Sequence, residues 1–236
     1  MPKPRPLVVK IGGGLLRAEG LDGLRRACAE AIELAASRPV LVVPGGGPFA
    51  DAVRTVDAQV GLTDEVAHAL ALRAMDQLGV LLSQLLPNAE RLAALVAPRA
   101  LAVVQAAAAF GGRPDVPESW AVTSDSLAVL AAAAIGAEEA VLLKPVGGVL
   151  ARWPSDDPGG WEPIPALSAA ELQALQAAGG GRAVDSYLPE AVRRTGVAVR
   201  VSPSRKRRGG APRRVPWIRR WPSSRPSPQA CAARTS

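Results

Sequence analysis

Residues 8–16 read VVKIGGGLL, a short apolar run that contains one lysine and ends directly in three glycines. Residues 40–54 repeat this arrangement as VLVVPGGGPFADAVR. Each apolar run has the length of a buried strand, and a helical pattern follows each set of glycines. Such turns expose backbone N–H groups beside a helix N-terminus, which suits phosphate oxygens. Two of them on successive strands would lie along one edge of a sheet, where open α/β folds bind ligands.

The rest of the chain alternates strand and helix patterns as far as residue 201. Apolar runs of strand length occupy residues 7–11, 40–43, 101–104, 140–143 and 197–201. Helical patterns occupy residues 21–36, 49–56, 63–86, 124–135, 168–178 and 185–195. Strands that are repeatedly followed by helices predict an α/β fold with a mainly parallel sheet and right-handed crossovers.

The lysine of the first turn precedes its glycines. No Gly-Lys-Ser/Thr follows either turn, so neither is a Walker A loop, and neither has the GxGxxG spacing and acidic residue of a dinucleotide fold. Lys10 stands instead at the end of its strand, from which an ammonium group can reach over the turn to a transferring phosphoryl group. A third glycine pair, Gly111-Gly112, follows the strand at 101–104 less closely.

Lysine is rare in this chain and its positions are informative. Only four of the 28 basic residues are lysines, and the two outside the terminal segments, Lys10 and Lys144, both end predicted strands. A compact ammonium in place of the bulkier guanidinium fits a confined position near phosphate. The alternative interpretation is that both are ordinary exposed charges at strand ends.

Residues 123–126, Thr-Ser-Asp-Ser, begin the Ala-rich helical pattern. Ser124 and Asp125 are preferred helix N-caps, which is one interpretation. The other places the carboxylate of Asp125 at the sheet edge, where it would hold lysines or a magnesium–nucleotide complex in line. Spacing alone does not decide between them.

Composition excludes several classes of protein. Cys28 and Cys231 are the only cysteines, so no disulfide framework or zinc spacing can be built from them, and the single histidine, His68, removes most other metal-site and Ser-His-Asp interpretations. A reducing cytoplasm is therefore expected, and His68 is expected to be structural. No apolar stretch has the length and freedom from charge of a membrane span, and the N-terminus does not resemble a signal peptide.

Taken together, VVKIGGGLL, VLVVPGGGPFADAVR, AVTSDSLAVLAA and AVLLKPVGGV resemble the amino acid kinase superfamily, in the right order over about residues 6–201. ALRAMDQLG at 71–79 and VDSYLPEAVRR at 184–194 are most similar to a small subgroup, which includes the kinase of aminomethylfuranylmethyl phosphate in methanofuran synthesis. The resemblance implies a three-layer αβα sandwich whose N-terminal half holds the phosphoryl acceptor and whose C-terminal half holds the nucleotide.

The resemblance also implies a reaction and its site residues. The chain would transfer the γ-phosphoryl group of ATP, with Mg²⁺ bound mainly through the nucleotide phosphates, to a small anionic acceptor such as a phosphate monoester or carboxylate. Lys10 and Asp125 would be catalytic, and Ser124 and Lys144 would face the nucleotide. The phosphate or acceptor would be bound by the glycines of the two turns: Gly12, Gly13, Gly14, Gly45, Gly46 and Gly47. Homo-oligomers are expected.

Two departures from the family pattern keep alternatives open. Relatives carry a late lysine in a Gly-Met-x-x-Lys stretch, whereas the comparable residues here are 179–182, Gly-Gly-Gly-Arg. Arg182 or Lys144 could substitute, or the chain could be a non-catalytic protein of the same fold that binds a nucleotide or oxyanion. ATP binding without turnover would distinguish such a binding protein from a kinase.

The second departure is the C-terminus. Residues 203–236 hold ten basic and no acidic residues, which leaves 18 basic against 21 acidic residues elsewhere, a net charge of −3. We expect residues 1–202 to form the kinase-like domain and 203–236 a disordered basic tail, left by a frameshift near codon 202, with one sheet edge uncovered. A nucleic-acid-binding protein is a further alternative, motivated by the tail alone.

Overall fold

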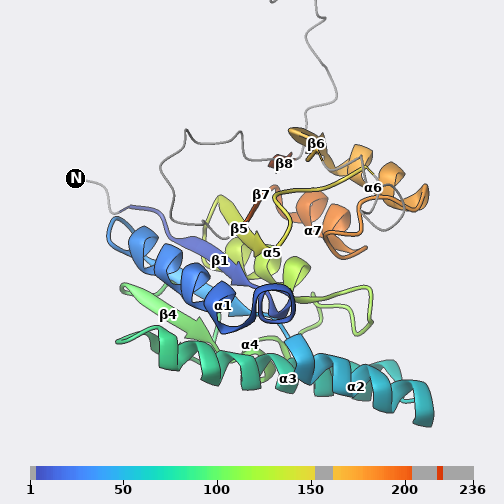
Figure 1. Ribbon diagram of the computed structural model, residues 1–236, viewed down its shortest axis with the longest axis horizontal. Coiled ribbons are helices and arrows are strands. Elements are labelled where there is room, and N and C mark those ends of the chain that lie inside the picture. The colour runs from blue at the N-terminus through green and yellow to red at the C-terminus, as the bar shows by residue number, and fades with distance from the viewer. Residues whose placement is uncertain (1–3, 152–161, 204–216, 220–236) are drawn as a thin grey trace, which may run out of the picture.

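The computed structural model describes residues 4–151, 162–203 and 217–219 (Figure 1). Over these ranges the strands form one sheet in the order β3-β4-β2-β1-β5-β7-β8-β6. Neighbouring strands are parallel except for β7 and β8, so the predicted mainly parallel sheet is confirmed. The strands are β1 (Leu7–Ile11), β2 (Val40–Pro44), β3 (Glu90–Leu92), β4 (Leu101–Val104), β5 (Glu139–Lys144), β6 (Ala166–Ser168), β7 (Ala198–Pro203) and β8 (Trp217–Arg219).

One or two helices separate successive strands or pairs of strands in the described ranges. Thr63 accepts a hydrogen bond from the N–H of Val66 and so caps the third helix, and Ser168 and Glu171 form the predicted capping box of the sixth. The helices are α1 (Gly13–Ala35), α2 (Gly47–Val60), α3 (Asp64–Leu85), α4 (Ala106–Phe110), α5 (Ser124–Ala134), α6 (Ala169–Ala177) and α7 (Leu188–Thr195). The first begins directly at its glycines, eight residues earlier than predicted, and is kinked at Gly20.

Strand β1 lies at the centre of the sheet, between β2 and β5, and all five of its residues are buried. Side chains alternate along it because successive Cβ atoms of a strand point to opposite faces. Leu7, Val9 and Ile11 pack into one core with α1 and the C-terminal half of α3. Val8 packs into the other core with α5 and α7. The sheet thus has helices on both faces, as the three-layer prediction requires (Figure 1).

The C-terminal boundary differs from the prediction. Strand β7 extends to Pro203, and β8 pairs with β7 at Val199 and Arg200 and with β6 on its other side. The buried Ile218 joins the core. The expectation that this edge stays uncovered, and that residues 203–236 lie wholly outside the fold, is therefore wrong for β8. Residues 204–216 and 220–236, where the disordered tail was expected, lie outside the described residues.

In the part of the chain that is described, no helix is both long and apolar enough to span a membrane.

Candidate active site

Lys10 and Lys144 stand at the same edge of the sheet and both bind Asp125. Strands β1 and β5 pair in parallel, so their carboxyl ends coincide. The Nζ of Lys10 lies 2.9 Å from Oδ1 of Asp125, and the Nζ of Lys144 lies 2.5 Å from Oδ2. Lys10 and Asp125 are only 6% and 3% exposed. The structure thus brings together three of the predicted site residues in one buried ion-paired cluster.

The pKa values of this cluster follow from burial and neighbouring charge. Burial raises the pKa of Asp125, but the ammonium groups of Lys10 and Lys144 outweigh that effect and hold the pKa at about 2. Burial lowers the pKa of Lys144 to about 8, with Asp125 opposing the shift and Lys10 adding to it. Lys10 and Lys144 therefore share the carboxylate of Asp125, and the carboxyl group of Asp185 is a further charge that acts on Lys144.

Asp185, from the segment between α6 and α7, caps helix α5. Its Oδ2 accepts hydrogen bonds from the backbone N–H groups of Thr123 and Ser126, both at 3.0 Å, and from the hydroxyl of Thr123. Its Oδ1 accepts from the hydroxyl of Ser126. Burial and the charge of Asp125 raise the pKa of Asp185. The capping interpretation of Ser124 and Asp125 is wrong, because both lie inside the first turn and Asp185 supplies the cap.

The two glycine turns pack against each other through their backbones. A Cβ on Gly13 would lie 2.0 Å from the Cα of Gly47, and a Cβ on Gly12 would lie 2.6 Å from the Nζ of Lys10. The N–H of Gly45 donates to the carbonyl of Ile11 at 2.9 Å and so extends the sheet. Helices α1 and α2 begin at these turns without a side-chain cap. Their first N–H groups have no intrahelical partner and point toward the same edge.

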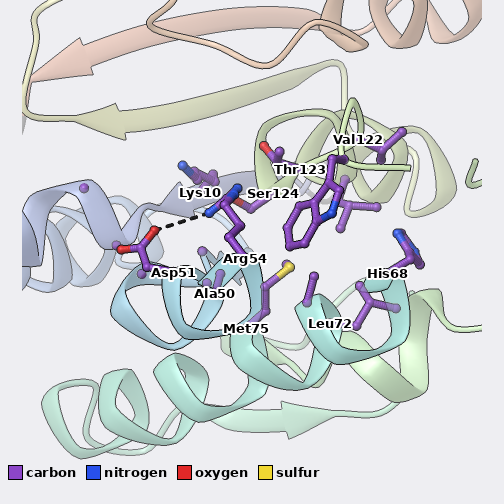
Figure 2. A pocket seen from close by; sticks show the side chains of 18 of the residues that line it. Lys10, Ala50, Asp51, Arg54, His68, Leu72, Met75, Val122, Thr123 and Ser124 are labelled. Carbon is purple, nitrogen blue, oxygen red and sulfur yellow. Dashed lines mark hydrogen bonds and ion pairs between the residues drawn. The ribbon is translucent and has the colours of Figure 1, made fainter. Parts of the chain in front are cut away.

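A cavity of about 170 Å³ opens beside these turns. It lies between the N-terminus of α1, helices α2 and α3, and the segment that leads into α5. Figure 2 shows Lys10 and Asp51 at one end of the cavity and His68 and Leu72 at the other. The full lining is Lys10, Gly13, Gly14, Arg17, Gly45, Gly46, Gly47, Ala50, Asp51, Arg54, His68, Ala71, Leu72, Met75, Trp120, Val122, Thr123, Ser124 and Leu127.

Most of the residues singled out from the sequence lie around this cavity. Lys10 and Ser124 line it, as do all the predicted glycines except Gly12, which lies against the side chain of Lys10. Asp125 and Lys144 form the ion-paired cluster with Lys10. The third glycine pair is separated from its strand by α4 and does not line the cavity, nor does the exposed Arg182, whose Nε donates to the carbonyl of Gly179.

Four residues of the site were not found from the sequence. Arg17, Arg54 and Trp120 line the cavity, and Asp185 fixes the helix that carries Asp125. Arg17 lies about one helical turn inside α1 and Arg54 about two turns inside α2, so each follows a glycine turn on the face above it, and that placement was an available signal. Trp120 and Asp185 come from loops, where no periodicity indicates which way a side chain points.

The comparison with protein families agrees with the fold. The model of the amino acid kinase family matches residues 5–202, most of the chain. The chain belongs to this family. A relative within it is the (5-(aminomethyl)furan-3-yl)methyl phosphate kinase of Methanocaldococcus jannaschii, 25% identical over 154 residues, which are 62% of this chain and 69% of the relative. The resemblance inferred from the sequence is confirmed, and these matches support phosphotransferase activity.

Solved structures of other family members share the fold. Aspartate kinase from Synechocystis superposes with a TM-score of 0.69 at 17% identity over 94% of this chain, which spans only 41% of that enzyme. Uridylate kinase from Archaeoglobus fulgidus superposes with a TM-score of 0.66 at 19% identity, over 90% of this chain and 99% of that enzyme. UMP kinase from Bacillus anthracis superposes with a TM-score of 0.67 at 16% identity, over 92% of this chain and 97% of that enzyme.

Proposed function

We propose that this protein transfers the γ-phosphoryl group of ATP to a small anionic acceptor, a phosphate monoester or a carboxylate. The observation that carries the proposal is the buried cluster in which Lys10 and Lys144 both bind Asp125. The ammonium groups of this cluster lie beside the first turns of two uncapped helices. This combination suits phosphoryl transfer, since catalysis rests on positioning and on neutralising the charge of the transferring group.

Each residue of the cluster has a separate role in this proposal. Lys10 lines the cavity and would stabilise the transferring phosphoryl group from the acceptor side. Lys144 lies on the other side of Asp125, at the end of β5, and would contact the nucleotide phosphates. Asp125 would hold both ammonium groups in line. Ser124 lines the cavity next to Asp125 and would contact the nucleotide phosphates.

Magnesium would enter with the nucleotide. Both carboxylate oxygens of Asp125 already contact lysines, so this residue is not a free metal ligand. Among the described residues no group of three or more His, Cys, Asp or Glu side chains could hold a metal ion. Mg²⁺ would therefore take its ligands mainly from the phosphate oxygens of ATP, and it would neutralise part of their negative charge.

The acceptor chemistry follows from the groups that surround the cavity. An oxygen of the acceptor bonds to the γ-phosphorus while the bond to the β–γ bridging oxygen breaks, and the electron pair of that bond leaves with ADP. An ionised phosphate or carboxylate has no proton to remove, so no general base is needed. His68 lies at the end of the cavity away from Lys10, which agrees with a reaction that does not use it (Figure 2).

ADP release in the presence of Mg·ATP and a panel of acceptors tests this proposal. The panel contains (5-(aminomethyl)furan-3-yl)methyl phosphate, UMP and aspartate, and ³¹P NMR identifies the product. We expect turnover with at least one phosphate monoester and none with its parent alcohol. Turnover of the alcohol with a pH limb that His68→Gln removes would contradict the anionic acceptor.

The non-catalytic alternative has one specific observation in its favour. Arg182 lies in the region comparable to the late lysine stretch of the family, and it is exposed and outside the cavity lining. Lys144 is thus left as the substitute near Asp125. Calorimetric binding of ATP, with no ADP formed with any acceptor of the panel, would favour this alternative.

We also propose that the chain forms homo-oligomers in the cytoplasm, on the strength of its family and its cysteine usage. Light scattering after size exclusion gives the oligomeric state directly. Non-specific nucleic-acid binding, if it occurs, would come from the basic residues after 203. Removal of those residues should then abolish the salt-dependent component of DNA or RNA binding.

A further inference from the structure

Trp120 forms a fixed part of the cavity wall. Its Nε1–H donates to Oδ2 of Asp57 at 2.7 Å, and the guanidinium carbon of Arg54 lies 4.7 Å from its ring centroid. Both partners belong to α2, whereas Trp120 lies in the loop before α5. Two attachments to another element leave the indole little freedom to lose when a ligand binds, so contacts with it cost little conformational entropy.

The end of the cavity away from Lys10 is apolar and uncharged. Leu72, Met75 and Val122 are buried there, together with His68. Burial lowers the pKa of His68, with the charge of Glu118 opposing the shift, and so favours the neutral imidazole. A charged group of an acceptor would be poorly solvated at this end, whereas a flat apolar group would find dispersion contacts.

The end at the glycine turns is cationic. Lys10, Arg17 and Arg54 line it against a single carboxylate, Asp51, which is ion-paired with both arginines. Figure 2 shows Arg54 between Asp51 and the apolar end. An anionic group of the acceptor is therefore favoured at this end, next to the ammonium of Lys10, where phosphoryl transfer would occur.

The size of the cavity limits the apolar group. Its volume of about 170 Å³ is close to that of an apolar cavity of about 150 Å³ that binds benzene. One five- or six-membered ring fits this volume, with its anionic group at the cationic end. A nucleoside, with a base and a sugar, would extend beyond it.

We propose that Trp120 is the residue that selects the acceptor, and that it does so by packing against a single small ring whose phosphate lies between Lys10, Arg17 and Arg54. The inference rests on the proposed function for the reaction itself, but the binding that it describes needs no ATP. Trp120 determines specificity here and takes no part in the chemical step.

Isothermal titration without ATP tests the inference, with benzyl phosphate, ethyl phosphate and UMP as probes. Wild-type protein should bind benzyl phosphate about tenfold more tightly than ethyl phosphate, and UMP no more tightly than ethyl phosphate. Trp120→Leu should lose about tenfold in affinity for benzyl phosphate and less than about twofold for ethyl phosphate, the scale of one lost aromatic contact. Trp120→Phe should retain most of the preference.

Equal losses for both phosphates in Trp120→Leu, or no ring preference in the wild type, would overturn the inference. UMP binding more tightly than benzyl phosphate would overturn it as well. Should Trp120→Leu fail to fold, Arg54→Gln is the second variant, because it should weaken both phosphates and benzyl phosphate more, since it also frees the Trp120 ring, while exposed Arg73→Gln weakens neither. A chain that binds benzyl phosphate as expected and releases no ADP upholds this inference and defeats the proposed function.

Discussion

Asp185 accepts hydrogen bonds from both the backbone N–H and the hydroxyl of Ser126, the residue that follows Asp125. A carboxylate from a distant loop thereby closes the first turn of α5, although three polar residues at that turn could have capped it. Its negative charge also complements the helix dipole. The direction of the Asp125 side chain between its two lysines thus depends on a residue 60 positions later in the chain.

Asp185→Ala should lower the free energy of unfolding by about 2 kcal/mol, because the N–H groups of Thr123 and Ser126 lose their acceptor. Asp185→Asn keeps an acceptor oxygen in place and should lose less than half as much. Urea denaturation measures both. Equal destabilisation by the two substitutions would mean that the charge of Asp185, and not its hydrogen bonding, matters for stability.

Lys10→Met should lower kcat by about two to three orders of magnitude, because the side chain keeps its length and loses the charge that stabilises the transferring phosphoryl group. The Kd for ATP should change much less. Arg25→Met, a change at an exposed cation of α1, is the matched control. Near-full turnover of Lys10→Met would remove this residue from the mechanism.

The pKa of Lys144 predicts an alkaline limb in the rate. Burial depresses this pKa to about 8, so the cationic form predominates below pH 8 and is lost as pH rises through it. Since kcat/KM reports the free enzyme, it should fall above about pH 8. The Lys144→Arg variant keeps a positive charge throughout this pH range, so its kcat/KM should not fall above pH 8, even if the variant is slower than the wild type. A limb unchanged by this substitution would assign it to another group.

Asp125→Asn should be strongly destabilising, by about 3–5 kcal/mol, because Lys10 and Lys144 would remain buried without a carboxylate. The double variant Asp125→Asn, Lys144→Met removes one of the stranded charges and should recover part of this loss. Chemical denaturation of the single and double variants forms the test. A double variant less stable than the single one would contradict the assigned pairing.

The central part of the fold was predictable because its signals are local. Strands β1, β2, β4 and β5 are continuous apolar runs, and the glycines that end the first two mark the edge at which the site lies. Lys10 and Lys144 were found for the same reason, as the rare lysines at strand ends. Their convergence on Asp125 was one of two open interpretations from the residues alone, and only the resemblance favoured it, since the convergence depends on the register between β1 and β5.

The features that escaped prediction depend on distant parts of the chain. Strand β3 reads Glu-Arg-Leu and β8 reads Trp-Ile-Arg, and neither three-residue segment has a strand pattern of its own. Each is a strand because a parallel neighbour supplies its hydrogen bonds. Trp120 likewise belongs to the cavity only because Asp57 and Arg54 lie opposite it.

The close contact between the two glycine turns leaves no room for a side chain at Gly13. A Cβ on Gly13 would lie 2.0 Å from the backbone of Gly47, whereas a Cβ on the adjacent Gly14 would meet only the ring of Pro145, at 3.8 Å. Gly13→Ala must therefore push the turns apart and should lower the free energy of unfolding by about 3 kcal/mol or more. Gly14→Ala lies within the helix and should be neutral or stabilising by up to about 1 kcal/mol. Urea denaturation of both variants compares two identical changes at neighbouring positions. Equal stability of the two would show that the turns are not in backbone contact.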